Sequence, residues 1–229
     1  MICGCAFANG TRFYGAVTLV GATIESDSSF SDAIFCKAAW FDDARFVGRS
    51  WFMRTAFEGV ASFKRTRWGR DLRFDGARCD GDLNMESARN LDLPITANLA
   101  GVTVGGDVKL TCSEGLAAIA LGGASIAGVV DLGSVHVAGR IQLAGATCGK
   151  AVVLDRATIR GTVSASGAVL RGAVSLRDAT LSAVSLTETR SGPSKVDRSG
   201  ATMTGRLHMR SGVLLEGELA EDTHERKRS

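Results

Sequence analysis

The fold is decided by residues 132–163, which read LGSVHVAGRIQLAGATCGKAVVLDRATIRGTV. Large apolar residues or cysteine recur here with a period of eleven, and the gaps between successive ones alternate between five and six residues. The recurring residues are Leu132, Val137, Leu143, Cys148, Leu154 and Ile159. Self-similarity at a short fixed period is typical of a solenoid, in which each repeat packs only on its neighbours.

Two apolar series extend this period over most of the 229 residues, with a three-residue slip around residues 90–96. The first series contains Leu19, Phe30, Phe41, Phe52, Phe63, Phe74, Met85, Leu99, Leu110, Leu121, Leu132, Leu143, Leu154 and Leu176. The second series contains Phe13, Ile24, Phe35, Phe46, Phe57, Trp68, Cys79, Val104, Ile126, Val137, Cys148, Ile159, Leu170 and Leu181. A helix needs apolar spacings of three and four, which these series lack.

Each eleven-residue unit predicts two short strands. A small or β-branched residue lies two positions before the large apolar one, as in Ala33 before Phe35 and Val152 before Leu154. That alternation points both side chains to the same side of an extended segment. Glycines such as Gly59 recur between the segments, where they indicate tight corners. The sequence therefore predicts an all-β chain.

The pattern of a small residue, any residue and a large apolar residue resembles the pentapeptide-repeat proteins over residues 8–214. It departs from them by a sixth residue in every second unit, as in bacterial L-x-G-A-x-I-x-G arrays. The resemblance implies a right-handed parallel β-helix with four faces. Two faces per eleven residues give a coil of 22, in which Phe30 and Phe52 stack and Phe30, Phe35, Phe41 and Phe46 fill one cross-section. A flattened eleven-residue coil with two faces is the alternative.

Composition divides the predicted solenoid into parts. All fourteen aromatic residues lie between Phe7 and Phe74, and the two prolines, Pro94 and Pro193, lie where the period falters. Proline cannot donate to a strand ladder, so both positions indicate loops or bulges. We therefore expect an aromatic-core segment over residues 1–90, an aliphatic-core segment over 91–215 that continues it, and a charged tail over 216–229 that either caps the last coil or hangs loose.

Residues that carry chemistry in other proteins have no reactive arrangement in this sequence. Cys79 and Cys148 occupy apolar positions of the series, which indicates small buried side chains. Cys3 and Cys5 form a lone C-x-C pair, and the three histidines, His136, His208 and His224, have no metal-ligand spacing. We predict no catalytic residue, no metal site and no cofactor.

The setting predicted for the chain is the cytoplasm. The N-terminus lacks a basic region followed by a long apolar core, so no secretory signal is visible. Residues 115–130 are uncharged, but they are too short and too rich in glycine for a confident membrane span. The cysteine usage fits a reducing compartment.

Charge is the one surface feature that stands out. The whole chain has a net charge of +3, but residues 45–78 hold nine basic residues against three acidic ones. A 22-residue coil would stack Arg45, Arg67 and Arg89 on one face, with Arg65 and Arg70 nearby. This set is our candidate site for an anion or an acidic partner. The alternative is a solvated face that discourages edge pairing.

The leading hypothesis for function is a non-enzymatic repeat scaffold that binds another protein. The main alternative is binding of phosphate, nucleic acid or another polyanion through the basic face, and self-association into an oligomer is open. The resemblance adds two further roles. Some pentapeptide-repeat proteins imitate DNA and bind gyrase, which needs an acidic rod, and some similar arrays are described as parts of membrane-associated oxidoreductases.

Overall fold

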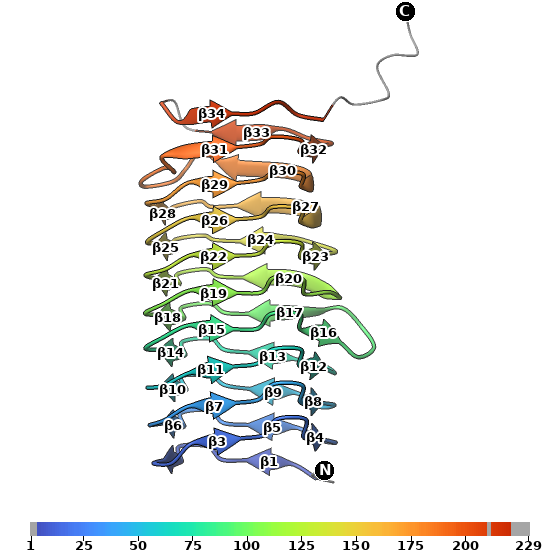
Figure 1. Ribbon diagram of the computed structural model, residues 1–229, viewed down its shortest axis with the longest axis vertical. Coiled ribbons are helices and arrows are strands. Elements are labelled where there is room, and N and C mark those ends of the chain that lie inside the picture. The colour runs from blue at the N-terminus through green and yellow to red at the C-terminus, as the bar shows by residue number, and fades with distance from the viewer. Residues whose placement is uncertain (1–3, 210–211, 221–229) are drawn as a thin grey trace, which may run out of the picture.

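The computed structural model describes residues 4–209 and 212–220, which form a parallel β-solenoid of about ten coils. Each coil advances the chain by 22 residues over most of its length, as in the pairing of Ala6 with Ser28 and of Ser28 with Ser50. Figure 1 shows the coils stacked in one column from β1 to β34. The predicted 22-residue period and four faces are confirmed, and the flattened eleven-residue coil is wrong.

The strands form four sheets, one for each face of the N-terminal coils. Sheet A contains β4 (Thr23–Ile24), β8 (Arg45–Phe46), β12 (Arg67–Trp68) and β16 (Arg89–Asn90). Sheet C contains β2 (Arg12–Phe13), β6 (Ile34–Phe35), β10 (Ala56–Phe57), β14 (Arg78–Cys79), β18 (Thr103–Val104), β21 (Ser125–Ile126), β25 (Thr147–Cys148) and β28 (Val169–Leu170).

The other two sheets extend to the C-terminal end. Sheet B contains β1 (Ala6–Phe7), β5 (Ser28–Ser29), β9 (Ser50–Trp51), β13 (Leu72–Arg73), β17 (Ile95–Asn98), β20 (Leu116–Ala120), β23 (His136–Val137), β24 (Ile141–Gln142), β27 (Thr158–Ser164), β30 (Thr180–Leu186), β32 (Thr202–Met203) and β33 (Leu207–Met209). Sheet D contains β3 (Val17–Thr18), β7 (Ala39–Trp40), β11 (Ala61–Ser62), β15 (Leu83–Asn84), β19 (Val108–Lys109), β22 (Val130–Asp131), β26 (Val152–Val153), β29 (Val174–Ser175), β31 (Lys195–Asp197) and β34 (Leu214–Glu216).

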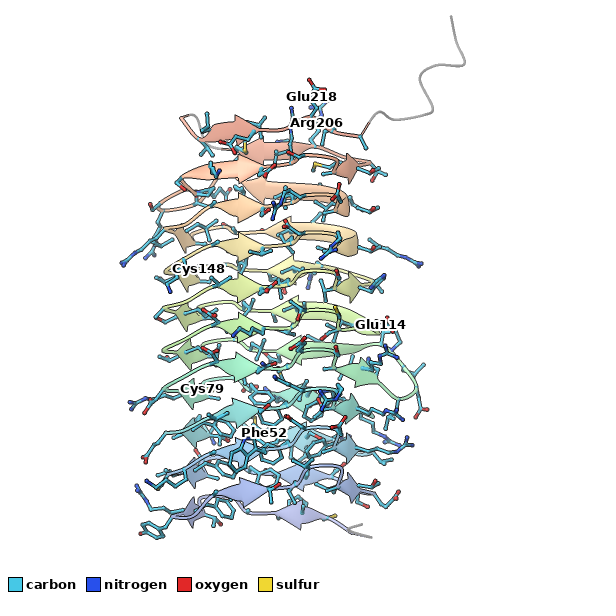
Figure 2. The ribbon with its side chains drawn as sticks, in the orientation of Figure 1. Phe52, Cys79, Glu114, Cys148, Arg206 and Glu218 are labelled. Carbon is cyan, nitrogen blue, oxygen red and sulfur yellow. The ribbon has the colours of Figure 1, made fainter. Side chains whose placement is uncertain are left out.

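The apolar series form the core. The Phe30 and Phe52 rings stack with centroids 5.2 Å apart, as predicted, and Phe41 stacks on Phe63 at 4.6 Å. Rings within one coil meet edge to face, as Phe35 and Phe41 do at 6.0 Å, or at a tilt, as Phe41 and Phe46 do at 6.3 Å. Figure 2 shows Phe52 among these rings inside the column. One buried cluster continues from the aromatic coils into the aliphatic ones, so both segments share a core.

Two kinds of corner join the strands. In one kind, the N–H of a small or β-branched residue donates to the carbonyl of the large apolar residue three positions earlier, as Ala33 does to Phe30 at 3.0 Å, and the residue directly before the donor has positive φ, as Asp32 does at 59°. In the other kind, a glycine lies against the preceding coil. A Cβ on Gly59 would lie 2.7 Å from the carbonyl carbon of Lys37, so only glycine fits there.

The corner between sheets A and B changes along the column. Through β16 the two sheets are separate, and residues 91–94, which include Pro94, then form the loop that projects beside β16 in Figure 1. Beyond this loop, β27 and β30 run through the corner as seven-residue strands. The face that carries Arg45, Arg67 and Arg89 is therefore a separate sheet only in the N-terminal coils.

Part of the predicted charged tail is bonded into the last coil. Glu216 lies within β34, where Lys195 donates to it at 2.9 Å, and the Ala220 N–H donates to the Ala201 carbonyl at 3.0 Å. The hydropathy of the sequence does not reveal that this segment packs onto the last coil, because the partner of the charged Glu216 lies 21 positions earlier in the chain. Residues 221–229 of the predicted tail lie outside the described residues.

The uncharged stretch at residues 115–130 contributes the strands β20 and β21 and the start of β22 to three sheets of the column. Leu121 and Ile126 of this stretch are buried in the core. The described chain contains no helix that is long and apolar enough to span a bilayer.

Candidate functional site

Three arginines form a straight row on sheet A. Arg67 pairs with Arg45 on one side and with Arg89 on the other, each as the first residue of its two-residue strand. The second residue of β8 and of β12, Phe46 or Trp68, is buried in the core, so the arginine before it is exposed. The stacking expected from a 22-residue coil is therefore present, at about 4.8 Å per strand.

These arginines line a surface groove of about 580 Å³, which we call the arginine groove. The groove is lined by Thr23, Asp43, Arg45, Arg65, Arg67, Ser87 and Arg89. Four arginines against one carboxylate give the lining three net positive charges, and none of its side chains is aliphatic or aromatic. The groove is therefore suited to an anionic ligand that has little apolar surface to bury.

Two of the four arginines have carboxylate partners. Arg65 binds Asp43 through two hydrogen bonds of 2.7 Å, and Arg89 lies 3.8 Å from Glu114. Figure 2 shows Glu114 beside the projecting loop. Within residues 4–209 and 212–220, Arg45 and Arg67 make no side-chain hydrogen bond and no ion pair. Their donors are free for a ligand.

Asp43 remains ionised inside this positive lining. The hydrogen bond from Arg65 is the main cause that lowers the pKa of the Asp43 carboxyl; burial opposes it, and the charges of Arg65 and Arg67 add smaller lowering effects. The same hydrogen bond raises the pKa of Arg65. Asp43 therefore reduces the positive field of the groove and occupies two donors of one of its arginines.

Arg70, the fifth residue of our candidate set, is not part of this groove. It lies in a separate hollow of about 330 Å³ with Cys5, Glu25, Asp27 and others, because the chain has already turned the corner toward sheet B at that point. The structure thus brings together four of the five predicted residues.

Part of the excess positive charge of residues 45–78 is neutralised by carboxylates that lie close to it in the fold. Four of the nine basic residues pair with carboxylates at 2.7–3.0 Å: Arg54 with Asp32, Arg65 with Asp43, Arg73 with Asp75 and Arg78 with Asp80. Three of these acidic partners lie outside the window that we counted. Asp32 and Asp43 lie one coil, or 22 residues, before their arginines, where a local count of charge does not detect them, and Asp80 lies two residues beyond the end of the stretch.

A second groove, on sheet D, was not predicted. Trp40, Ser62 and Asn84 follow one another on β7, β11 and β15, and the small Ser62 leaves a hollow of about 670 Å³ between its larger neighbours. Trp40 is 39% exposed and Val60, at the adjoining corner, 54%. We call this hollow the tryptophan groove. A tryptophan followed 22 residues later by serine was the signal that could have revealed it.

Charge around the tryptophan groove is opposite to that of the arginine groove. Its charged lining residues are Asp42, Glu58, Lys64, Asp80 and Asp82, which give three net negative charges. Asp42 accepts a 2.5 Å hydrogen bond from the Ser62 hydroxyl and one from the Lys64 N–H, and Asp82 pairs with Lys109 at 2.8 Å. The groove therefore combines an aromatic wall with an anionic rim.

The cysteines and histidines lie as follows. Burial raises the pKa of the Cys79 thiol to about 12, with a contribution from Asp80, and that of Cys148 to about 11. Both are buried, as predicted (Figure 2). His136 is exposed on the later coils, whereas Cys3 and His224 lie outside the described residues. Among the described residues, no group of three His, Cys, Asp or Glu side chains could hold a metal ion.

Comparison with known proteins finds the repeat family. Residues 8–52 and 48–89 match the family model described as pentapeptide repeats (9 copies). The N-terminal coils of this chain are thus pentapeptide repeats, and the coils after residue 89 continue their solenoid. No curated protein and no solved structure matches the chain.

Proposed function

We propose that this chain is a non-enzymatic scaffold that presents the tryptophan groove on sheet D to a partner protein. The observation that carries the proposal is the exposed Trp40 ring, placed beside a hollow on a flat sheet. Tryptophan is enriched among the residues that dominate protein–protein binding energy, because it buries a large surface and orders few torsions.

The rigidity of the coil supports the same role. Trp40 and Ser62 belong to strands that are hydrogen-bonded within the column, and the Leu19 N–H donates to the Trp40 carbonyl at 2.8 Å. A surface that is already ordered loses little conformational entropy when a partner binds. The anionic rim of Asp42 and Glu58 would orient a partner whose facing surface is basic.

Two remaining predictions bear on this role. The proposed compartment is the cytoplasm, which the free cysteines Cys5, Cys36, Cys79, Cys112 and Cys148 support. Imitation of DNA, which the resemblance implied, needs an acidic rod surface. The arginine groove disfavours that role.

Site-specific cross-linking tests the proposal. A photoreactive amino acid at Asn84, which lines the groove beside Ser62, should capture a defined set of proteins. Trp40→Ala should reduce that capture about 30-fold, the equivalent of a 2 kcal/mol contribution. The matched control carries the same photoreactive group at Val153, also the outward residue of a sheet D strand but about three coils away.

A second variant distinguishes loss of partner binding from loss of folding. Ser62→Arg fills the hollow and leaves Trp40 in place, so it should also abolish capture while the thermal melt of the coil is kept. The proposal fails if the Asn84 and Val153 probes capture the same proteins, or if capture by the Asn84 probe survives Trp40→Ala or Ser62→Arg.

A further inference from the structure

The arginine groove on sheet A has a lining that fits phosphate better than it fits a protein surface. A guanidinium group is planar and offers five N–H donors in a fork that matches a phosphate. Arg45 and Arg67 have their donors uncommitted within the described residues. Protein interfaces need an apolar core, and the side chains around this groove supply none.

The length of the row fits a short run of phosphates. Arg45, Arg67 and Arg89 lie on consecutive strands, so the row extends about 10 Å at ~4.8 Å per strand. One strand of a nucleic-acid duplex presents a phosphate about every 3.4 Å along the axis. About three phosphates of one strand therefore lie opposite the three arginines.

The surroundings of the row favour a duplex over a single strand. Proteins that bind single strands stack the bases on aromatic side chains. Trp40 and Trp51 lie on sheets D and B, and Trp68 is buried beneath the row. A duplex offers its phosphates while its bases stay stacked on one another, so it requires no aromatic platform from the protein.

We propose that the arginine groove binds the phosphate backbone of a nucleic-acid duplex without reading its sequence. This inference is independent of the scaffold role, because it uses a different sheet and a ligand of opposite charge. Backbone contacts position a duplex but carry no sequence information. Two duplexes of equal length and unrelated sequence should therefore bind equally.

Asp43 is predicted to weaken this binding. It is the one carboxylate of the lining, and it holds Arg65 through two hydrogen bonds. Asp43→Asn removes the negative charge and releases Arg65, so that the groove carries four net positive charges. Asparagine is among the residues that tolerate the positive φ of 59° at this position, so the corner should be preserved.

The experiment is fluorescence anisotropy with two 20-base-pair duplexes between 50 and 200 mM salt. For three phosphate contacts the logarithm of affinity should fall with the logarithm of salt at a slope near −2.7, which is about a 40-fold loss across this range. Arg45→Gln with Arg67→Gln should reduce the loss to about 3.5-fold. Asp43→Asn should bind more tightly than the unmodified chain.

The matched control is Arg140→Gln with Arg171→Gln, which removes the same charge from two exposed positions on other parts of the column. This control should retain the slope of the unmodified chain. The proposal is overturned if neither duplex binds at 50 mM salt, if the control variant loses as much as the groove variant, or if Asp43→Asn binds more weakly. Tighter binding of a polyglutamate of equal charge would also overturn it, in favour of an acidic protein segment.

Discussion

Replacement of Phe52 by alanine should destabilise the N-terminal coils strongly. Phe52 is 0% exposed, stacks on Phe30 and Phe74 at 5.2 and 4.8 Å, and meets Phe63 edge to face at 5.1 Å. Removal of a fully buried phenylalanine typically costs about 3–5 kcal/mol, because the lost transfer energy adds to the cost of the remaining cavity. We expect a cost in this range for Phe52→Ala.

Phe13→Ala provides the comparison within the same stack. Phe13 lies in the first coil, is only partly buried and stacks on Phe35 at 4.8 Å. Half of the usual burial energy of a large apolar side chain gives about 1 kcal/mol for this variant. The two substitutions delete the same atoms, so the difference between them measures enclosure by neighbouring coils.

Hydrogen exchange of the ladder amides is the suitable assay, because a solenoid can open locally and one melting temperature would average over its coils. Phe52→Ala should accelerate exchange at Asp32, Phe41 and Arg54, whose N–H groups donate to the next coil, and should leave the ladder around Leu154 nearly unchanged. Equal costs for the two variants, or uniform acceleration along the whole column, would refute the reasoning.

Two further outcomes follow from the corners. Gly59→Ala places a Cβ 2.7 Å from the backbone of Lys37 and should lower the free energy of unfolding, measured by thermal melting, by about 1–3 kcal/mol. A Cβ on Gly15 would have no atom within 4 Å, so Gly15→Ala should change this free energy by no more than about 0.5 kcal/mol. Equal effects of the two variants would contradict the close approach at Gly59 as the cause. Asp32 and Asp43 have lowered pKa values, chiefly through hydrogen bonds from Arg54 and Arg65, so their stabilisation is present above about pH 4 and is lost as the pH falls through the folded-state values. The melting temperature of the double variant Asp32→Asn with Asp43→Asn should therefore approach that of the unmodified chain as the pH falls from 6 to 2, and a gap as large at pH 2 as at pH 6 would exclude this linkage.

The period of the apolar residues is enough to predict most of the fold. Phe30 and Phe52 stack because residues 22 apart return to the same place in consecutive coils, and that distance can be read directly from the spacing of the phenylalanines. The row of Arg45, Arg67 and Arg89 follows from the same arithmetic. The right-handed sense of the coil came from the resemblance alone and stays a prediction.

The features that could not be predicted from the sequence depend on details that differ between the faces of the coil. The ion pairs of Arg54 with Asp32 and of Arg65 with Asp43 became visible only once the coil fixed which charges are neighbours. Arg70 does not line the arginine groove with the other predicted residues, because one corner of the coil separates it from Arg67. The tryptophan groove arises from a difference in size between Trp40 and Ser62, and a count of apolar positions does not register side-chain volume on the outer surface.

The confinement of every aromatic ring to the coils before Met85 has an optical consequence. Tryptophan emission and the near-ultraviolet signal of aromatic rings report only on those coils, since Trp40, Trp51 and Trp68 are the three tryptophans and Tyr14 is the single tyrosine. The aliphatic coils that follow are silent at these wavelengths, whereas far-ultraviolet dichroism records the backbone of the whole column. The chain thus carries a built-in local reporter, and comparison of the two signals separates events in its first third from events in the rest.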